Sequence, residues 1–375
     1  MSLDTSISNY GEIKIEEETL IKSILSAIRW LVESGIQNNA GDISIHGGFN
    51  AFFNQETQSY PYVYAEATGY ALCLFAYLSK NYQAKKTFLI ERGNMACNWL
   101  LNNLDDNGLI NHSYILPNGP LVTEQYIFDA AICGMGLLRY QNLVKDKCIL
   151  EKAKQIAIAL TKLQKPDGSL PAVVPESHSG DRWSRRFNVH HAKVAMFLVE
   201  AADIFKDSSF IESALKICRL ILHQQSHNGF FKINDKICYV HPHCYACEGL
   251  LCVGRKLKEA KIEESGVRGI SWLAHFQNLD GSINQWFPGD GTRANDSLAQ
   301  SLRLWFVSDK NRFSACIYRG IEILTRQQYL QGPKSVYGGF RYSSTIRDVN
   351  SWTTIFAIAA LVSYVNQDTT IYDLF

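Results

Sequence analysis

A short phrase recurs along the chain and divides it into units of similar length. In each copy an apolar helical segment is followed by Gln or Asn and then by a turn that contains Gly. Glycine supplies the positive φ that ends a helix, so each phrase marks the end of one helix and the loop after it. Four copies are close to one another and two are looser; the six begin at Trp30, Trp99, Leu160, Leu220, Trp272 and Leu324.

A second helical segment follows each loop and is apolar nearly all round, whereas the first segment of each unit is amphipathic. Six hairpins with one amphipathic and one fully buried helix predict a closed double ring. The predicted fold is therefore all-α, an (α/α)6 toroid (barrel) of six helical hairpins. It forms a single domain over residues 1–375, with residues 1–14 as an N-terminal tail. The inner helices are predicted to begin near Glu66, Asp129, His190, His243, Asp296 and Ser351.

This organisation resembles the (α/α)6 toroid of six-hairpin glycosidases, polysaccharide lyases and sugar 2-epimerases. Prenyltransferases and terpene cyclases share the architecture, and the phrases with Gln before Asp-Gly look like the Gln-Trp repeats of the cyclases. The resemblance extends from about Thr19 to Val365. It implies the fold and leaves the activity open, because one fold supports many chemistries.

Charge and hydropathy exclude several classes of partner. Lys and Arg number 37 against 36 Asp and Glu, so no positive excess favours nucleic acid or an anionic membrane. No apolar run reaches the roughly 18 residues of a membrane span, and the N-terminus lacks the pattern of a secretory signal. Most of the ten cysteines lie in apolar helical segments, where free thiols pack as small hydrophobes. A cytoplasmic location is expected.

Carboxylates stand where the inner helices begin, and in a toroid these starts meet at one rim. Glu66, Asp129 and Asp296 occupy such positions. They are either helix caps, which the free N–H groups of a first turn favour, or an acid/base pair of the kind glycosidases require.

Histidines and a tyrosine at the same rim offer a second chemistry. His190, His243 and Tyr245 are candidates for proton transfer near neutral pH. The resemblance to sugar 2-epimerases, which use a histidine pair, and to toroidal lyases implies the same role. Buried histidines satisfied by hydrogen bonds are the structural alternative.

Arginines and aromatic residues complete the predicted site. Guanidinium groups suit a carboxylate such as that of a uronic acid, or they form ion pairs on the surface, while aromatic faces stack on sugar rings. The predicted substrate-binding residues are Tyr62, Tyr64, Arg182, Trp183, Arg186, His191, His241, Trp286, Arg293, Arg347 and Trp352.

The stretch "VHPHCYACEGLL" (240–251) carries zinc-type side chains, but its ligands cannot converge. His243 and Cys244 are consecutive and would point about 100° apart on a helix. No metal and no cofactor are expected. The last repeat also looks like that of a prenyltransferase β subunit, although Trp352 stands where that family has its zinc-ligand His.

The sequence therefore predicts a carbohydrate-active enzyme that cleaves glycosidic bonds in an oligosaccharide, polysaccharide or sugar conjugate. Anionic substrates that contain a uronate are among those expected. Uronate elimination or sugar epimerisation by His and Tyr is the first alternative. A prenyltransferase-like or terpene-cyclase-like toroid and a noncatalytic glycan-binding toroid are further alternatives. A carbohydrate is the expected partner, and no oligomeric state is predicted.

Overall fold

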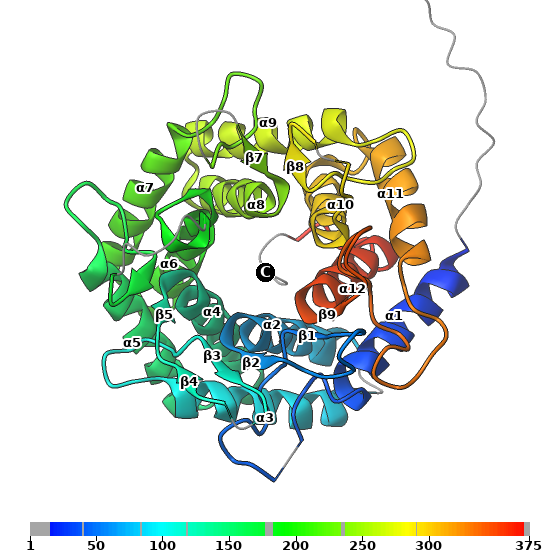
Figure 1. Ribbon diagram of the computed structural model, residues 1–375. Coiled ribbons are helices and arrows are strands. Elements are labelled where there is room, and N and C mark those ends of the chain that lie inside the picture. The colour runs from blue at the N-terminus through cyan, green and yellow to red at the C-terminus, as the bar shows by residue number, and fades with distance from the viewer. Residues whose placement is uncertain are drawn as a thin grey trace, which may run out of the picture.

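Within the described residues, twelve α-helices alternate between an outer and an inner ring (Figure 1). The computed structural model describes residues 16–39, 41–82, 85–117, 119–176, 183–233, 237–289 and 291–370, so the predicted tail, residues 1–14, lies outside the described residues. The outer helices are α1 (Glu17–Glu33), α3 (Lys86–Asn103), α5 (Lys147–Leu163), α7 (Ser208–Leu222), α9 (Ala260–Phe276) and α11 (Ser314–Arg326). The inner helices are α2 (Ala65–Asn81), α4 (Ile127–Val144), α6 (Ala192–Phe205), α8 (Val240–Leu257), α10 (Asn295–Asp309) and α12 (Ser351–Val365).

The two rings differ in how much of each helix is buried. On outer helix α7 the buried residues Phe210, Ala214, Ile217 and Ile221 recur at the helical period, so one face packs inward. Inner helix α12 is buried almost all round because it packs between α2 and α10 as well as against α1. Within the described part of the chain, no helix is long and apolar enough to cross a bilayer.

In five of the six repeats, a Gln of the repeated phrase ties the loop to the next outer helix. Gln277 Nε2 donates to the carbonyl of Gly281 at 2.9 Å and to that of Cys316 in α11 at 3.0 Å. In the second repeat Leu104 stands at the corresponding position and cannot make this bridge. The same double bridge is made by Gln37, Gln164, Gln225, Gln277 and Gln328.

The Gly of the phrase is required by close approach as well as by its backbone angle. Gly281 has φ +90°, and a Cβ at this position would lie 2.5 Å from the carbonyl oxygen of Arg319 in α11. The loop thus packs directly on the backbone of the following outer helix.

Short antiparallel strand pairs join neighbouring loops at the end of the ring where the inner helices begin (Figure 1). Together with the 3₁₀ turns Trp183–Arg185 and Val189–His191, they set the direction in which the chain enters each inner helix. The pairs are β1 (Phe52–Phe53) with β9 (Val349–Asn350), β2 (Tyr62–Tyr64) with β3 (Ser113–Ile115), β3 with β4 (Leu121–Val122), β5 (Gln125–Tyr126) with β6 (Val173–Val174), and β7 (Cys238–Tyr239) with β8 (Trp286–Phe287).

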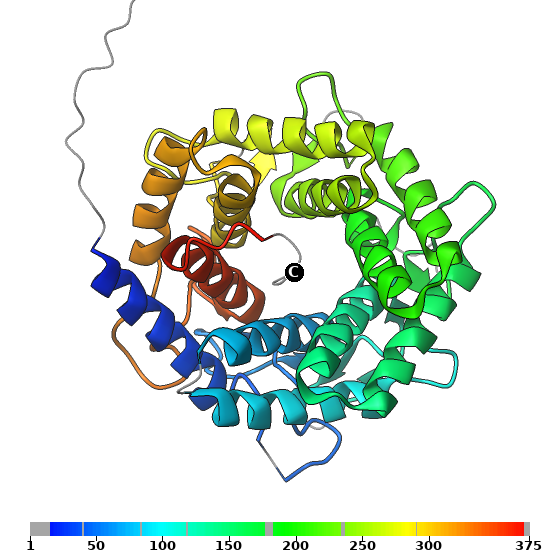
Figure 2. The ribbon, with the colours of Figure 1, turned by 180° about the vertical axis from the view of Figure 1, so that it is seen from behind.

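The first and last hairpins close the ring, which Figure 2 shows from behind. Strand β1 pairs with β9, and the N–H of Ser351 donates to the carbonyl of Ala51 at 3.0 Å. Trp30 of α1 donates from its indole N–H to Ser335, as Trp99 of α3 donates to Ser44 at an internal interface. This seam therefore uses the same contacts as an interface between consecutive hairpins.

Candidate active site

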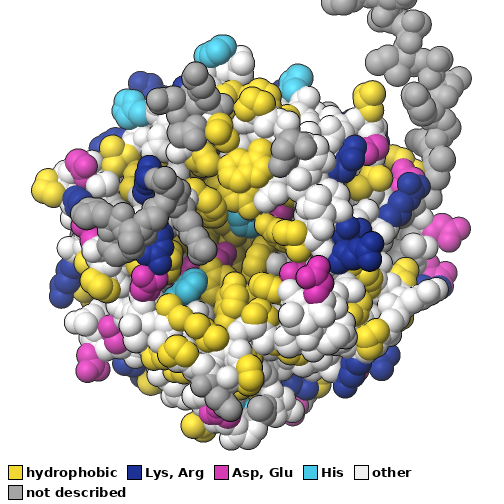
Figure 3. Space-filling view, in the orientation of Figure 1, with side chains coloured by type: hydrophobic (Ala, Val, Ile, Leu, Met, Phe, Trp, Pro, Cys, Tyr) yellow, Lys and Arg dark blue, Asp and Glu magenta, His cyan; other side chains and the backbone are white. Residues whose placement is uncertain are grey.

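A cavity of about 230 Å³ opens at the end of the ring where the inner helices begin. Figure 3 shows it as a hollow at the centre of this face, with hydrophobic walls and with acidic and histidine side chains inside. The predicted site residues that line it are Tyr62, Tyr64, Glu66, Asp129, Trp183, His190, His241, Tyr245, Asp296 and Trp352. The cavity is also lined by His112, Tyr126, Phe128, Ser184, Tyr239 and Tyr342, which the predicted set did not include.

Glu66 is the second residue of α2, and the N-cap residue of this helix, Tyr64, makes no side-chain capping hydrogen bond. The hydroxyls of Tyr64 and Tyr245 contact the two carboxyl oxygens of Glu66, the second at 3.1 Å. Burial raises the pKa of Glu66 to about 7, and the nearby Asp129 carboxylate adds to the effect. The Glu66 carboxyl therefore keeps its proton up to about neutral pH, where it can act as an acid.

Asp129, the third residue of α4, pairs with a histidine from the loop after α3. Its Oδ2 lies 2.8 Å from Nδ1 of His112. Burial raises the pKa of Asp129. Burial opposes the charged form of His112, but Asp129 outweighs it and raises the pKa of the imidazole.

A second pair of the same kind lies on α8 and α10. Nδ1 of His241 is 2.8 Å from Oδ2 of Asp296. The other oxygen of Asp296 accepts from the backbone N–H of Ser297 at 2.6 Å, so Asp296 engages one N–H of the first turn of α10 as well as the ring of His241. In each pair the carboxylate engages Nδ1, which leaves Nε2 as the nitrogen that can exchange a proton with a ligand.

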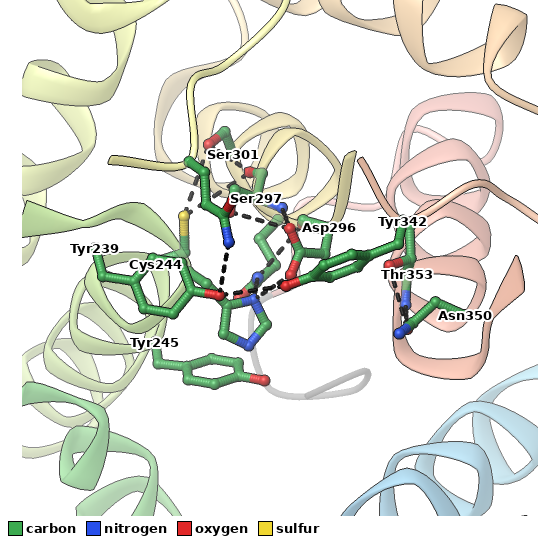
Figure 4. A network of polar contacts seen from close by, with 12 residues as sticks. Tyr239, Cys244, Tyr245, Asp296, Ser297, Ser301, Tyr342, Asn350 and Thr353 are labelled. Atoms are coloured by element: carbon green, nitrogen blue, oxygen red, sulfur yellow. Dashed lines mark hydrogen bonds and ion pairs between the residues drawn. The ribbon is translucent and has the colours of Figure 1, made fainter. Parts of the chain in front are cut away.

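Aromatic side chains form the wall between these pairs. Figure 4 shows the hydroxyls of Tyr239 and Tyr342, 3.3 Å apart, beside Asp296 and above the ring of Tyr245 in that view. Trp183 meets Tyr239 edge to face at 5.5 Å. Such rings offer flat surfaces for the apolar faces of sugars and hydroxyls for their oxygens.

His190 belongs to this wall as a neutral imidazole. It is 2% exposed and stands edge to face against Trp183, with ring centroids 4.9 Å apart. Burial first, and then His191 and His241, lower the pKa of His190 well below its usual range. Its Nδ1 has no hydrogen-bond partner among the described residues.

Comparisons of sequence and structure give different results. No family model matches the sequence, and no curated protein matches it either. Solved structures match over nearly the whole chain. Cellobiose 2-epimerase from Bacillus thermoamylovorans B4167 superposes with a TM-score of 0.75 at 12% identity, covering 94% of this chain and 99% of that one. The chain has the (α/α)6 toroid fold.

Other toroids with sugar substrates superpose similarly. An unsaturated glucuronyl hydrolase from Bacillus sp. GL1, responsible for the degradation of glycosaminoglycan, has a TM-score of 0.72 at 12% identity, covering 95% of this chain and 99% of that one. An α-amylase from Clostridium perfringens has a TM-score of 0.64 at 16% identity, covering 95% and 100%. These similarities confirm the predicted fold, and at such low identity they show the fold alone.

Two predicted histidines do not reach the cavity of the toroid. Helix α8 begins at Val240, so His241 and Tyr245 face the cavity while His243 faces α9. His243 accepts from the N–H of Phe231 and contacts the carbonyl of Gly269. The expectation that His243 lies at the rim is thus wrong, and burial lowers its pKa to about 3. His191 is buried against the backbone of Asn188 instead.

Among the described residues, the predicted arginines and Trp286 lie outside the cavity as well. Arg293 pairs with Asp280 at 3.1 Å, as expected of a surface ion pair. Arg186 lines a separate cavity of about 180 Å³, and Arg347 is not among the residues that line the central one. Trp286 stacks on Tyr239 at 4.4 Å and supports the wall from behind. Arg182 lies outside the described residues.

The cysteine and histidine motif on α8 does not gather into a metal site. No cluster of three or more His, Cys, Asp or Glu that could hold a metal is found in the described ranges. Cys244 lies near the hydroxyl of Ser301 at 3.7 Å, and Cys247 contacts His243 at 3.4 Å. All ten cysteines are free thiols.

The missed His112 had a positional signal. It is the fourth residue after the turn glycine Gly108, as Tyr342 is after Gly338. The carbonyl of this fourth residue accepts the first N–H of the preceding inner helix, from Ala65 to His112 at 3.1 Å and from Asn295 to Tyr342 at 3.0 Å. A polar or aromatic residue here is therefore held at the rim.

Proposed function

We propose that this toroid is a carbohydrate-active enzyme that cleaves a glycosidic bond, with Glu66 as the general acid. The observation that carries the proposal is the Glu66 carboxyl, which faces the cavity and has a pKa raised to about 7. A carboxyl protonated near neutral pH can donate to the oxygen of a leaving sugar. The similarity to toroids named for cellobiose, glucuronyl and amylase chemistry supports a sugar as substrate.

The base in this reaction is one of the two carboxylate pairs. Inverting glycosidases place a base opposite the acid, where it activates water. Asp129 with His112 and Asp296 with His241 both line the cavity that Glu66 faces. Aromatic side chains, Trp183 and Trp352 among them, hold the sugar ring between acid and base.

The charge of the substrate has to be tested by comparing neutral sugars with sugars that carry a uronate. No Lys or Arg side chain lines the cavity among the described residues, whereas three carboxylic acids do. A uronate would therefore bind through hydroxyl donors such as those of Tyr239 and Tyr342, or through Arg182, which lies outside the described residues. Neutral and uronate-bearing sugars belong in the same screen.

The test is a hydrolysis screen read by mass spectrometry. Purified protein is incubated with neutral oligosaccharides and with saturated and unsaturated uronate oligosaccharides, and new reducing ends are counted. Glu66→Gln is expected to abolish cleavage, and Glu56→Gln, which changes an exposed carboxylate, to leave it intact. Cleavage that survives in Glu66→Gln would contradict the role of Glu66. Binding of sugars without any turnover would favour the glycan-binding alternative.

Epimerisation is a second candidate, favoured by the two histidine–aspartate pairs. His112 and His241 come from different repeats and line the same cavity, each with Nδ1 on a carboxylate. Two such bases can remove a proton from a sugar carbon and return it from the other side. Incubation of reducing disaccharides in D₂O, followed by NMR, distinguishes the candidates: deuterium at the carbon next to the anomeric centre without cleavage indicates epimerisation.

A further inference from the structure

A buried cluster of charged side chains lies one turn beyond Tyr245 along α8. Lys193 of α6 is 0% exposed, and its Nζ lies 2.5 Å from Oε2 of Glu248. Arg303 of α10 binds the other oxygen of Glu248. Burial would raise the pKa of Glu248, but Lys193 and Arg303 outweigh it and lower the pKa, so the carboxylate is ionised. Two cations and one anion leave the cluster with a net positive charge.

Such a cluster is a poor stabiliser of the ring. Removing charges from water costs free energy, and hydrophobic residues of similar volume often serve a core at least as well. The position of Lys193 suggests another role, because its ammonium lies over the faces of two tyrosine rings. The distances from Nζ to the ring centroids are 5.6 Å for Tyr70 and 5.5 Å for Tyr245.

Tyr245 connects this cation to the cavity. Its ring stacks on Tyr70 with centroids 6.3 Å apart, and its hydroxyl donates to Oε1 of Glu66 at 3.1 Å. A cation over the face of a phenol draws electron density from the ring and strengthens the O–H as a donor. Two successive contacts, from Lys193 to the ring of Tyr245 and from the Tyr245 hydroxyl to Glu66, therefore connect the buried cluster to the candidate acid.

We propose that Lys193 is a positioning residue: held by Glu248, it fixes the ring of Tyr245 and strengthens the hydrogen bond that Tyr245 donates to Glu66. The proposal rests on the proposed role of Glu66 as the acid of the cavity. Lys193 does not line the cavity. Its effect is to favour the ionised form of Glu66, against the burial that favours the neutral form.

Other charged and titratable groups also face Glu66 and Lys193. The variants that test the proposal have to leave these groups unchanged. Those around Glu66 are Tyr64, Tyr70, His112, Asp129 and His241. Those around Lys193, besides Glu248 and Arg303, are Arg139 and the thiols of Cys73 and Cys244.

The test is a direct titration of Glu66, which needs no substrate. The side-chain carboxyl carbon is followed by ¹³C NMR in Glu-labelled protein and assigned with Glu66→Gln. Lys193→Met is expected to raise the Glu66 midpoint by about half to one pH unit, less than the full strength of a desolvated cation–π contact because the effect reaches Glu66 only through the Tyr245 hydroxyl. Arg303→Met is the matched control, because it removes the same charge from Glu248 on the other carboxyl oxygen, and it is expected to shift the midpoint less.

A double substitution tests whether the effect of Lys193 reaches Glu66 through the hydroxyl of Tyr245. In a Tyr245→Phe background, which lacks the hydroxyl, Lys193→Met is expected to shift Glu66 much less than in the native chain. Equal shifts in both backgrounds, or equal shifts for Lys193→Met and Arg303→Met, would overturn the proposal. If Lys193→Met does not fold, Glu248→Gln serves instead. Burial lowers the pKa of Lys193 and Glu248 raises it, so without Glu248 the Lys193 ammonium is released and driven toward its neutral form. The Glu66 midpoint is then expected to rise as in Lys193→Met, and a fall or no change overturns the proposal.

The outcome is separate from that of the hydrolysis screen. A chain that turns over no sugar can still show the Lys193-dependent titration of Glu66. A chain that cleaves sugars can lack it, and then only the role of Lys193 is contradicted.

Discussion

Glu66 links the proposed chemistry to the stability of the protein. Its pKa is about 7 in the folded state, above the usual value of 4.5, so the folded protein holds this proton more tightly than the unfolded chain does. The stability from this group is fully present below about pH 4.5 and is lost as pH rises through about 7.

Glu66→Gln is therefore expected to raise the melting temperature relative to the native chain more at pH 8 than at pH 5. The glutamine cannot ionise, so it avoids the cost of a buried carboxylate. Thermal unfolding at both pH values checks this, with Glu56→Gln as the exposed control. A melting-temperature difference that does not change with pH would contradict the raised pKa.

Truncation of His112 is expected to reduce turnover, whereas truncation of His243 is expected to reduce stability. His112→Ala removes a side chain from the cavity and is expected to lower the turnover rate by about 10²- to 10⁴-fold, the usual contribution of a proton-transfer group. His243→Ala leaves the N–H of Phe231 without its acceptor and is expected to cost about 1–3 kcal/mol of stability instead.

Turnover per folded molecule and the free energy of unfolding separate the two histidines. His275→Ala, at an exposed position, should change neither. A catalytic loss in His243→Ala that exceeds its loss of folded protein would contradict the placement of His243 against α9.

The contrast between these histidines also shows what the sequence could predict. Glu66, Asp129 and Asp296 were predicted at the rim because the repeat fixes where each inner helix begins, and the structure places them there. His243 was not separable from His241 because an inner helix is buried on all sides, so apolar periodicity gives no phase. His112 lies in a loop, where no helical period applies.

At the scale of an element, replacing a turn glycine by alanine can destabilise the protein in two ways, through the backbone angle and through a steric clash of the added Cβ. Gly281 and Gly291 both have positive φ, +90° and +83°, but only Gly281 has backbone within reach of an added Cβ. Gly291→Ala is expected to cost about 1–2 kcal/mol for its backbone angle. Gly281→Ala must in addition push the loop off the carbonyl of Arg319, so it is expected to cost clearly more.

Chemical denaturation of both variants measures the difference. Equal losses would show that the loop moves away from α11 at no cost. The sequence predicted that Gly281, the glycine of the repeated phrase, ends a helix, but not that it packs on the next hairpin. The contacted residue, Arg319, lies in the following outer helix, and no local pattern marks it.

At the scale of the whole molecule, the seam and the internal interfaces should have similar strength. Trp30 at the seam and Trp99 at the first internal interface are each 1% exposed, and each packs on the second glycine of a Gly-Gly pair. Trp30→Ala and Trp99→Ala are both expected to cost about 3–5 kcal/mol in a single unfolding transition. An early, separate transition in Trp30→Ala alone would show a weaker seam.

The seam also determines when the ring can be completed during synthesis. The hydroxyl of Ser23 binds Gln328, 305 residues further along the chain. At about 5–20 residues per second, a ribosome needs about 15–60 s to make the chain between them. During that time the last hairpin has not been synthesised. The apolar face of α1 and the carbonyl of Ala51 therefore lack the groups that they contact in the folded protein. The nascent protein is an open arc with an exposed edge, which is the form that chaperones bind and the form in which aggregation competes with closure.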